Sequence, residues 1–140
     1  MNCVREWLAG SLLIADGAWG TESQARGLAP GVAPDTWNLT HPERVEAVAR
    51  CYVEASSQII LTNTFRTNSV AMEDDMEAID RAGGALSKRA DGDALVIASI
   101  GPTGKILIAG EISKEQAHAA FAVQAADSQL RVRTRCWWKR

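Results

Sequence analysis

Three apolar runs recur along the chain, and each ends in a cluster of polar and small residues. They occupy positions 12–15, 59–61 and 94–100. The second run does not alternate between apolar and polar positions, which is typical of a strand buried on both faces of a parallel sheet. It turns polar at Thr62 and Asn63, where the strand should end and where α/β folds bind ligands. Taken alone, this segment favours a simpler interpretation, a core strand that runs into a solvated loop.

An amphipathic helix is predicted between the first two runs, after a loop at 24–34. Thr40 and Glu43 form a capping box with Pro42 in the first turn, so His41 is interpreted as a helix-start residue rather than a ligand. The apolar face of this helix is predicted to consist of Val45, Val48, Ala49, Tyr52 and Val53.

Two further helices are predicted from the same kinds of signal. One covers 70–89 and is weakened by about 1 kcal/mol for each glycine of Gly83-Gly84 relative to alanine. The other begins at a second capping box, formed by Ser113 and Gln116. The resulting order of strand, helix, strand, helix, strand, helix is the βα repeat of a parallel α/β protein.

A cluster of polar and small residues follows the first run directly. It contains Asp16, Gly17, Gly20 and Glu22. Two glycines this close allow a tight turn and a close approach of the backbone to a ligand. An ordinary Asp-Gly turn explains the same residues. Neither this loop nor the one at 101–104 matches a Walker A sequence or G-x-G-x-x-G, so a nucleotide site has little support.

Composition places the chain among ordinary soluble proteins of one domain. It has 140 residues, 46% hydrophobic and 23% charged, with a formal net charge of -2. This charge favours neither nucleic acid nor an anionic membrane as a partner. No run approaches the roughly 18 apolar residues of a membrane span, and the N-terminus has no apolar stretch long enough for a signal peptide, so we expect a cytoplasmic protein.

The three cysteines are Cys3, Cys51 and Cys136, odd in number and far apart. They form no C-x-x-C pair, so the sequence predicts neither a zinc site nor a disulfide framework. Cys51 lies beside the apolar face of the first helix and is expected to be a small core or boundary residue.

Four phrases, in this order, resemble the homocysteine S-methyltransferase family. They are residues 16–22 (Asp-Gly-Ala-Trp-Gly-Thr-Glu), 37–42 (Trp-Asn-Leu-Thr-His-Pro), 59–65 (Ile-Ile-Leu-Thr-Asn-Thr-Phe) and 99–104 (Ser-Ile-Gly-Pro-Thr-Gly). The family includes betaine–homocysteine methyltransferase, S-methylmethionine-dependent enzymes and the homocysteine-binding domain of cobalamin-dependent methionine synthase. The resemblance extends over roughly 12–126.

The resemblance implies a (β/α)8 barrel with its site at the carboxyl ends of the strands. In the family, zinc bound by three cysteines late in the chain holds homocysteine as a thiolate, whose sulfur attacks an activated methyl group. The family's aspartate that binds the substrate's amino group corresponds to Asp16, with Gly17 offering backbone contact. Asn63 is a weaker candidate for the same pocket, and Glu22 is expected to orient the first loop.

The chain also departs from the family pattern. A barrel needs eight strands and typically about 250 residues, whereas three strands are predicted here, so residues 1–126 are expected to be a truncated, partial homocysteine-binding domain. None of the three cysteines matches the family's zinc ligands, so no catalytic or metal residue is assigned. We expect an inactive fragment with unpaired sheet edges and exposed apolar helix faces. A non-catalytic α/β interaction module, an unstable truncated product and a different small α/β enzyme remain alternatives, and the sequence does not identify the methyl donor.

Residues 127–140 form a basic tail, with a local charge of +4 against -6 for the preceding 126 residues. The tail has neither helical nor alternating periodicity, and we expect it to be a frameshift product. In the frame that begins at the third base of each codon, the codons of 136–139 (Cys-Trp-Trp-Lys) must encode Leu-Val-Glu, which resembles the family's next strand and its glutamate. A genuine tail that binds an acidic partner is the alternative, and sequencing the gene across codons 124 to 140 and beyond decides between them.

Overall fold

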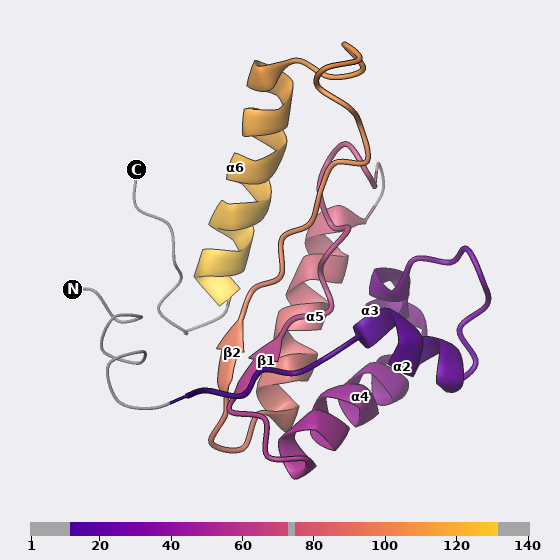
Figure 1. The fold of residues 1–140 in the computed structure, drawn as a ribbon, viewed down its shortest axis with the longest axis vertical. Helices are drawn as coiled ribbons and strands as arrows, with labels where there is room; N and C mark the ends of the chain where they lie inside the picture. Colours follow the sequence, from indigo (N-terminus) through magenta and orange to yellow (C-terminus); the bar gives the residue numbers. More distant parts are fainter. Residues whose placement is uncertain (1–11, 73–74, 132–140) are drawn as a thin grey trace.

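The computed structural model describes residues 12–72 and 75–131, with side chains up to position 127. This part of the chain is a mixed α/β structure with two parallel strands and five α-helices. In chain order the elements are α2 (Trp19–Ala25), the 3-10 helix η1 (Pro34–Thr36), α3 (Trp37–Thr40), α4 (Pro42–Glu54), β1 (Ile59–Leu61), α5 (Met76–Ala90), β2 (Leu95–Ile97) and α6 (Lys114–Arg131). The helices pack beside one another, with α5 between α4 and α6 (Figure 1).

The two strands pair in parallel register through Ile60 and Val96, and neither of these side chains is exposed. This burial explains the uninterrupted apolar run, because a strand covered on both faces has no polar side to present. Ile60 packs with Ala49 of α4 and Ala90 of α5 in one core cluster. Burying a side chain of this size stabilises the fold by roughly 1.5–3 kcal/mol.

The first predicted strand, at 12–15, is reduced to a single parallel bridge between Ala15 and Ile59 in the described residues. The backbone N–H of Ile59 donates to the carbonyl of Ile14 at 3.1 Å, and the N–H of Asp16 donates to the carbonyl of Ile59 at 2.9 Å. Leu12 is 89% exposed, so the run does not continue into the core as a longer strand would. The prediction of three full strands was therefore wrong for this segment, although its position beside β1 is as expected.

The capping box predicted at Thr40 and Glu43 was wrong. Thr40 is the last residue of α3, and its hydroxyl donates back to the carbonyl of Thr36 at 3.2 Å instead of capping α4. His41 occupies the N-cap position without a side-chain cap bond, and Pro42 begins the helix. The interpretation of His41 as a helix-start residue is confirmed, because His41 is the N-cap of α4. The hydroxyl of Thr40 bonds to the carbonyl of Thr36 and so does not cap this helix.

The predicted start of α6 is confirmed, and the predicted start of α5 is corrected. At α6 the capping box is confirmed, since Ser113 N donates to Gln116 Oε1 at 2.9 Å and Gln116 N donates to Ser113 Oγ at 3.1 Å. The helix predicted over 70–89 begins at Met76, because Asn68 Oδ1 accepts the N–H groups that follow it and holds the chain in a turn. No described helix has the length and apolar character needed to cross a membrane.

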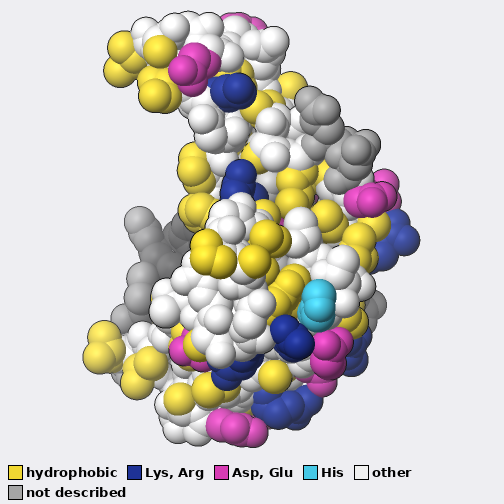
Figure 2. All heavy atoms as spheres, turned by 90° about the vertical axis from the view of Figure 1, so that its right-hand side faces the viewer, with side chains coloured by type: hydrophobic (Ala, Val, Ile, Leu, Met, Phe, Trp, Pro, Cys, Tyr) yellow, Lys and Arg dark blue, Asp and Glu magenta, His cyan; other side chains and the backbone are white. Residues whose placement is uncertain are grey.

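A long connection leads from β2 to α6 and reaches the top of the molecule (Figure 1). Its apolar residues Ile106, Leu107 and Ile108 are all exposed, with Ile108 at 101%. Figure 2 shows hydrophobic atoms gathered at this end beside charged side chains. These residues lie in a loop, whereas the expectation concerned apolar helix faces. Val123 on α6 is half-exposed and is the one of the four that lies on a helix.

Candidate functional site

Asp16 follows the bridge at Ala15 and so lies at the carboxyl end of the parallel sheet. Its Oδ2 accepts two hydrogen bonds, from Trp19 Nε1 at 2.7 Å and from the backbone N–H of Leu61 at 2.8 Å. Its Oδ1 is buried and has no hydrogen-bond partner among the described residues. A buried carboxylate oxygen without a donor is costly, so this atom marks a place where a ligand that donates a hydrogen bond is favoured.

The electrostatics of this carboxyl group agree with its geometry. Burial raises the pKa of Asp16 above its usual value, while the hydrogen bonds from Trp19 and Leu61 oppose that rise. A cation placed at Oδ1 would restore the stabilisation that burial removes from the ionised form. The arrangement is therefore suited to an ammonium group.

Gly17 follows Asp16 directly and is exposed. A Cβ atom at this position would lie 3.1 Å from the hydroxyl oxygen of Tyr52, which α4 contributes. The pKa of Tyr52 is raised by burial first and then by the negative charges of Glu22 and Asp16. Gly17 thus keeps the turn open for the tyrosine, and its own backbone stays accessible at the same end of the sheet.

Glu22 lies on α2 and forms an ion pair with Arg26 one turn later. Both side chains are about one-third exposed. Its carboxylate is therefore held along the helix surface by Arg26, and no hydrogen bond joins it to the unpartnered oxygen of Asp16 in the described residues. The role expected for it in orienting the first loop stays a prediction.

Asn63 is 4% exposed, and its carboxamide serves neighbouring segments. Its Nδ2 donates to the carbonyl of Pro34 at 2.9 Å and to Oδ1 of Asn38 at 2.9 Å. Asn38 Nδ2 in turn donates to the carbonyl of Asn63 at 2.7 Å. The side chain therefore ties the loop after β1 to η1 and α3, and its assignment to the substrate pocket stays a prediction.

A second set of buried hydroxyls joins the ends of the two strands. Thr62 Oγ1 and Thr64 Oγ1 lie 2.6 Å apart, Ser99 N donates to Thr62 Oγ1 at 2.9 Å, and Thr64 Oγ1 donates to the carbonyl of Ser99 at 2.9 Å. These contacts hold the loop after β1 against the segment after β2. From the sequence, these residues were predicted only as polar residues at the strand end, without these contacts.

Two buried polar residues were not predicted to take part in this region. Asp35 is 1% exposed and accepts the backbone N–H of Arg66 at 2.8 Å, and burial raises the pKa of its carboxyl group. Gln124 of α6 donates through Nε2 to the carbonyl of Thr64 at 2.8 Å. The loop after β1 is therefore clamped from η1 and from α6, which lie far from it in the sequence.

Gly83 of α5 lies against this loop. A Cβ atom there would lie 2.6 Å from Asn38 Nδ2 and 2.7 Å from Thr64 Cγ2. The glycine was predicted only as a cost to helix stability, and the structure gives it a reason, since it lets α5 approach the loop closely.

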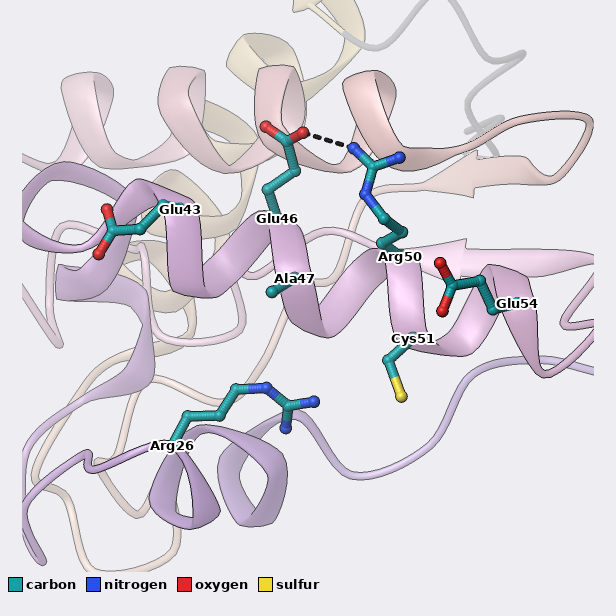
Figure 3. Close-up of a pocket in the computed structure, with 7 residues that line it drawn as sticks. All are labelled: Arg26, Glu43, Glu46, Ala47, Arg50, Cys51 and Glu54. Atoms are coloured by element: carbon teal, nitrogen blue, oxygen red, sulfur yellow. Dashed lines mark hydrogen bonds and ion pairs between the residues drawn. The ribbon is translucent and has the colours of Figure 1, made fainter.

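An open groove of about 520 Å³ lies apart from Asp16, between α2 and α4 (Figure 3). It is lined by Arg26, Glu43, Glu46, Ala47, Arg50, Cys51 and Glu54. Cys51 is exposed there, so its expected place in the core or at its boundary was wrong. The reason is its position on α4, which turns it away from the cluster of Ala49 and Ile60 and towards Arg26.

The described residues do not provide a zinc site of the family's kind. Among them no group of three or more His, Cys, Asp or Glu side chains is arranged to hold a metal ion. Cys51 stands on the α2–α4 groove with arginine and glutamate neighbours, and the other two cysteines lie outside the described residues. The donor set therefore does not fit zinc, and no chemical step is assigned to the metal here.

Comparison with known proteins gives a consistent family and fold. The family described as Homocysteine S-methyltransferase matches residues 13–135. No curated protein sequence matches the chain significantly. Among solved structures, homocysteine methyltransferase MmuM from Escherichia coli is similar in its metallated form, with a TM-score of 0.75 and 22% identity over 95% of this chain and 56% of that one.

The apo form of MmuM gives a TM-score of 0.67 at 23% identity, over 94% of this chain and 50% of that one. The oxidized form gives 0.62 at 24% identity, over 74% and 42%. At this identity the structures show the fold alone, and the chain spans about half the length of the MmuM structures that it matches. With the family match over 13–135, the chain belongs to the homocysteine S-methyltransferase family.

Proposed function

We propose that this chain is the N-terminal part of a homocysteine S-methyltransferase and that it supplies the subsite for the amino group of homocysteine. In this proposal the described βα units form the first part of a (β/α)8 barrel whose remaining strands complete the sheet beyond β2. The family match and the similarity to about half of MmuM support this placement.

The observation that carries the proposal is the unpartnered, buried Oδ1 of Asp16. The substrate class contains a primary ammonium group, which can donate to this oxygen and neutralise the buried charge. The interaction is a charge-assisted hydrogen bond, worth about 1.5–3 kcal/mol. Gly17 follows directly, and its exposed backbone can offer a contact to the substrate beside Asp16.

Methyl transfer to homocysteine needs three things: a bound amino acid, an activated sulfur and a methyl donor. The sulfur forms a bond to the methyl carbon, the donor leaves with the electron pair of its own bond to that carbon, and the thiol proton is lost. The described residues supply a candidate for the first requirement, while the zinc of the family finds no fitting ligand set among them. We therefore propose that the isolated chain is inactive as a methyltransferase.

The test uses the 140-residue chain labelled with ¹⁵N and titrated with homocysteine, with and without zinc. We expect saturable shifts of the amide signals of Asp16, Gly17 and Leu61 in both series, and no methionine when a methyl donor is added. The matched ligand is 4-mercaptobutyrate, which keeps the thiol and carboxylate but lacks the amino group, and it should leave these signals unchanged. Equal shifts with both ligands, or none with homocysteine, would contradict the amino-group assignment.

A non-catalytic interaction module remains the second candidate, because Ile106, Leu107 and Ile108 expose an apolar loop. Size-exclusion chromatography with light scattering separates the two ideas. If the chain self-associates and homocysteine does not shift the amide signal of Asp16, the interaction module is favoured. The expectations of a cytoplasmic location and of no nucleic-acid partner stay predictions.

A further inference from the structure

Trp19 connects the core of the molecule to the candidate subsite. It is the first residue of α2, and its side chain packs against both core clusters, the one around Trp37 and Leu86 and the one around Ile60. Its indole N–H donates to Oδ2 of Asp16 at 2.7 Å. A hydrogen-bond donor is thus held in place by apolar packing and directed at one oxygen of the carboxylate.

Both donors to Asp16 meet on the same oxygen, and they come from different elements. Leu61 N–H belongs to β1, and the indole belongs to α2. Two bonds to Oδ2 from two directions fix the rotation of the carboxyl group about its Cβ–Cγ bond. The position of Oδ1, which has no partner among the described residues, is therefore set by groups that do not touch it.

We propose that Trp19 is a positioning residue for the amino-group subsite: its indole N–H occupies Oδ2 of Asp16, so that Oδ1 is presented to the ammonium group of the substrate. This inference rests on the proposed function, since it assigns the ligand of Oδ1. Phenylalanine could fill the same apolar space but could not donate the bond, so packing alone does not account for the indole.

The electrostatic surroundings of Asp16 are consistent with this role. Burial raises the pKa of Asp16, and the bond from Trp19 lowers it again towards the ionised form that an ammonium group requires. Tyr52 of α4 is the titratable group on which Asp16 acts. Its pKa is raised by burial first and then by Glu22, Asp16 and Cys51, while Arg26 of the neighbouring segment lowers it. No cation among the described residues contributes to the pKa of Asp16, so the hydrogen bonds carry the compensation.

The experiment compares Trp19→Phe with Trp37→Phe in the 140-residue chain. Trp37 is a matched control, because it is a buried core tryptophan of the cluster that Trp19 also contacts. The side-chain ¹³C signal of Asp16 is titrated with acid in each variant, and homocysteine affinity is measured from the amide shifts. We expect Trp19→Phe to raise the pKa of Asp16 and to weaken homocysteine binding about tenfold, while Trp37→Phe changes neither.

The outcomes separate the two proposals. An unchanged titration of Asp16 in Trp19→Phe, or a changed titration with unchanged affinity, overturns the positioning role. Failure of the unsubstituted chain to bind homocysteine at Asp16 overturns the proposed function instead. If Trp19→Phe does not fold, the indole ¹⁵N–¹H signal of Trp19 is followed in the unsubstituted chain, where it should shift with the ionisation of Asp16 while that of Trp37 does not. A Trp19 signal indifferent to this ionisation also overturns the inference.

Discussion

Replacing Gly83 by alanine is expected to destabilise the fold, although alanine is the better helix former. Gly83 lies inside α5, where the intrinsic preference favours alanine by about 1 kcal/mol. The new Cβ would lie 2.6 Å from Asn38 Nδ2 and 2.7 Å from Thr64 Cγ2, well inside van der Waals contact. Relieving such overpacking typically costs about 1–3 kcal/mol.

The displaced group is also a hydrogen-bond donor. Asn38 Nδ2 donates to the carbonyls of Asn63 at 2.7 Å and of Ile79 at 3.0 Å, and weakening these buried bonds adds about 1–3 kcal/mol. With the losses at the lower end of each range, and after the helix preference is subtracted, we expect Gly83→Ala to lower the free energy of unfolding by about 1 kcal/mol. The assay is urea denaturation followed by far-ultraviolet circular dichroism, with the slope against urea checked for two-state behaviour.

Gly20→Ala is the matched control, because Gly20 is also helical but has open space where its Cβ would lie. It should leave the free energy of unfolding unchanged or raise it by at most about 1 kcal/mol. A Gly83→Ala variant as stable as the unsubstituted chain would refute the claim that α5 packs on the loop after β1 at this distance.

Three further predictions concern single side chains. Burial raises the pKa of Asp35, so the folded chain keeps that proton to higher pH than the unfolded chain, and the free energy of unfolding should fall as pH rises from the usual value of 3.8 through the raised folded pKa. In urea denaturation across that pH range, Asp35→Asn should flatten this slope. An unchanged slope would contradict the burial of this carboxyl group. Ser113→Ala removes the bond to the N–H of Gln116 and should lower the free energy of unfolding by about 1 kcal/mol in the same assay. An unchanged free energy would mean that this cap does not stabilise α6. Asp16→Asn, in a form of the protein with the remaining strands restored, should weaken homocysteine binding by about 1–3 kcal/mol in calorimetry, and unchanged affinity would remove Asp16 from the site.

Much of the fold could be predicted because its signals are local. The apolar runs at β1 and β2, the helix face of α4 and the capping box at Ser113 depend on residues within one or two turns of each other. The errors occurred where a distant or competing partner decides the outcome. Thr40 bonds back to Thr36 rather than capping α4, and Asn68 takes the N–H groups that would have begun α5 earlier.

Less of the candidate site than of the fold could be predicted from the sequence. Asp16 could be singled out from the family phrase and from its place after an apolar run, but nothing in the pattern indicated that Trp19 would donate to it. The contacts of Asp35 and Gln124 with the loop after β1 were missed, because the residues that each pair joins are 31 and 60 positions apart. Such contacts depend on how helices return to the sheet, which local periodicity does not specify.

A polar cluster at the end of a buried strand is therefore ambiguous evidence for a ligand. Thr62, Asn63 and Thr64 have the residue types of a binding site, yet within the described residues their side chains bond to one another or to η1, α3 and the segment after β2. They stabilise the loop because buried polar groups must find partners. Asp16 differs in keeping one buried oxygen without such a partner among the described residues while the other accepts two bonds. Gln124 also keeps a buried oxygen, Oε1, without a partner among the described residues while its Nε2 donates to the loop after β1, so an unpartnered oxygen alone does not identify a ligand site. Asp16 is distinguished because its unpartnered oxygen belongs to an ionisable group at the carboxyl end of the sheet, where a cationic donor would be favoured.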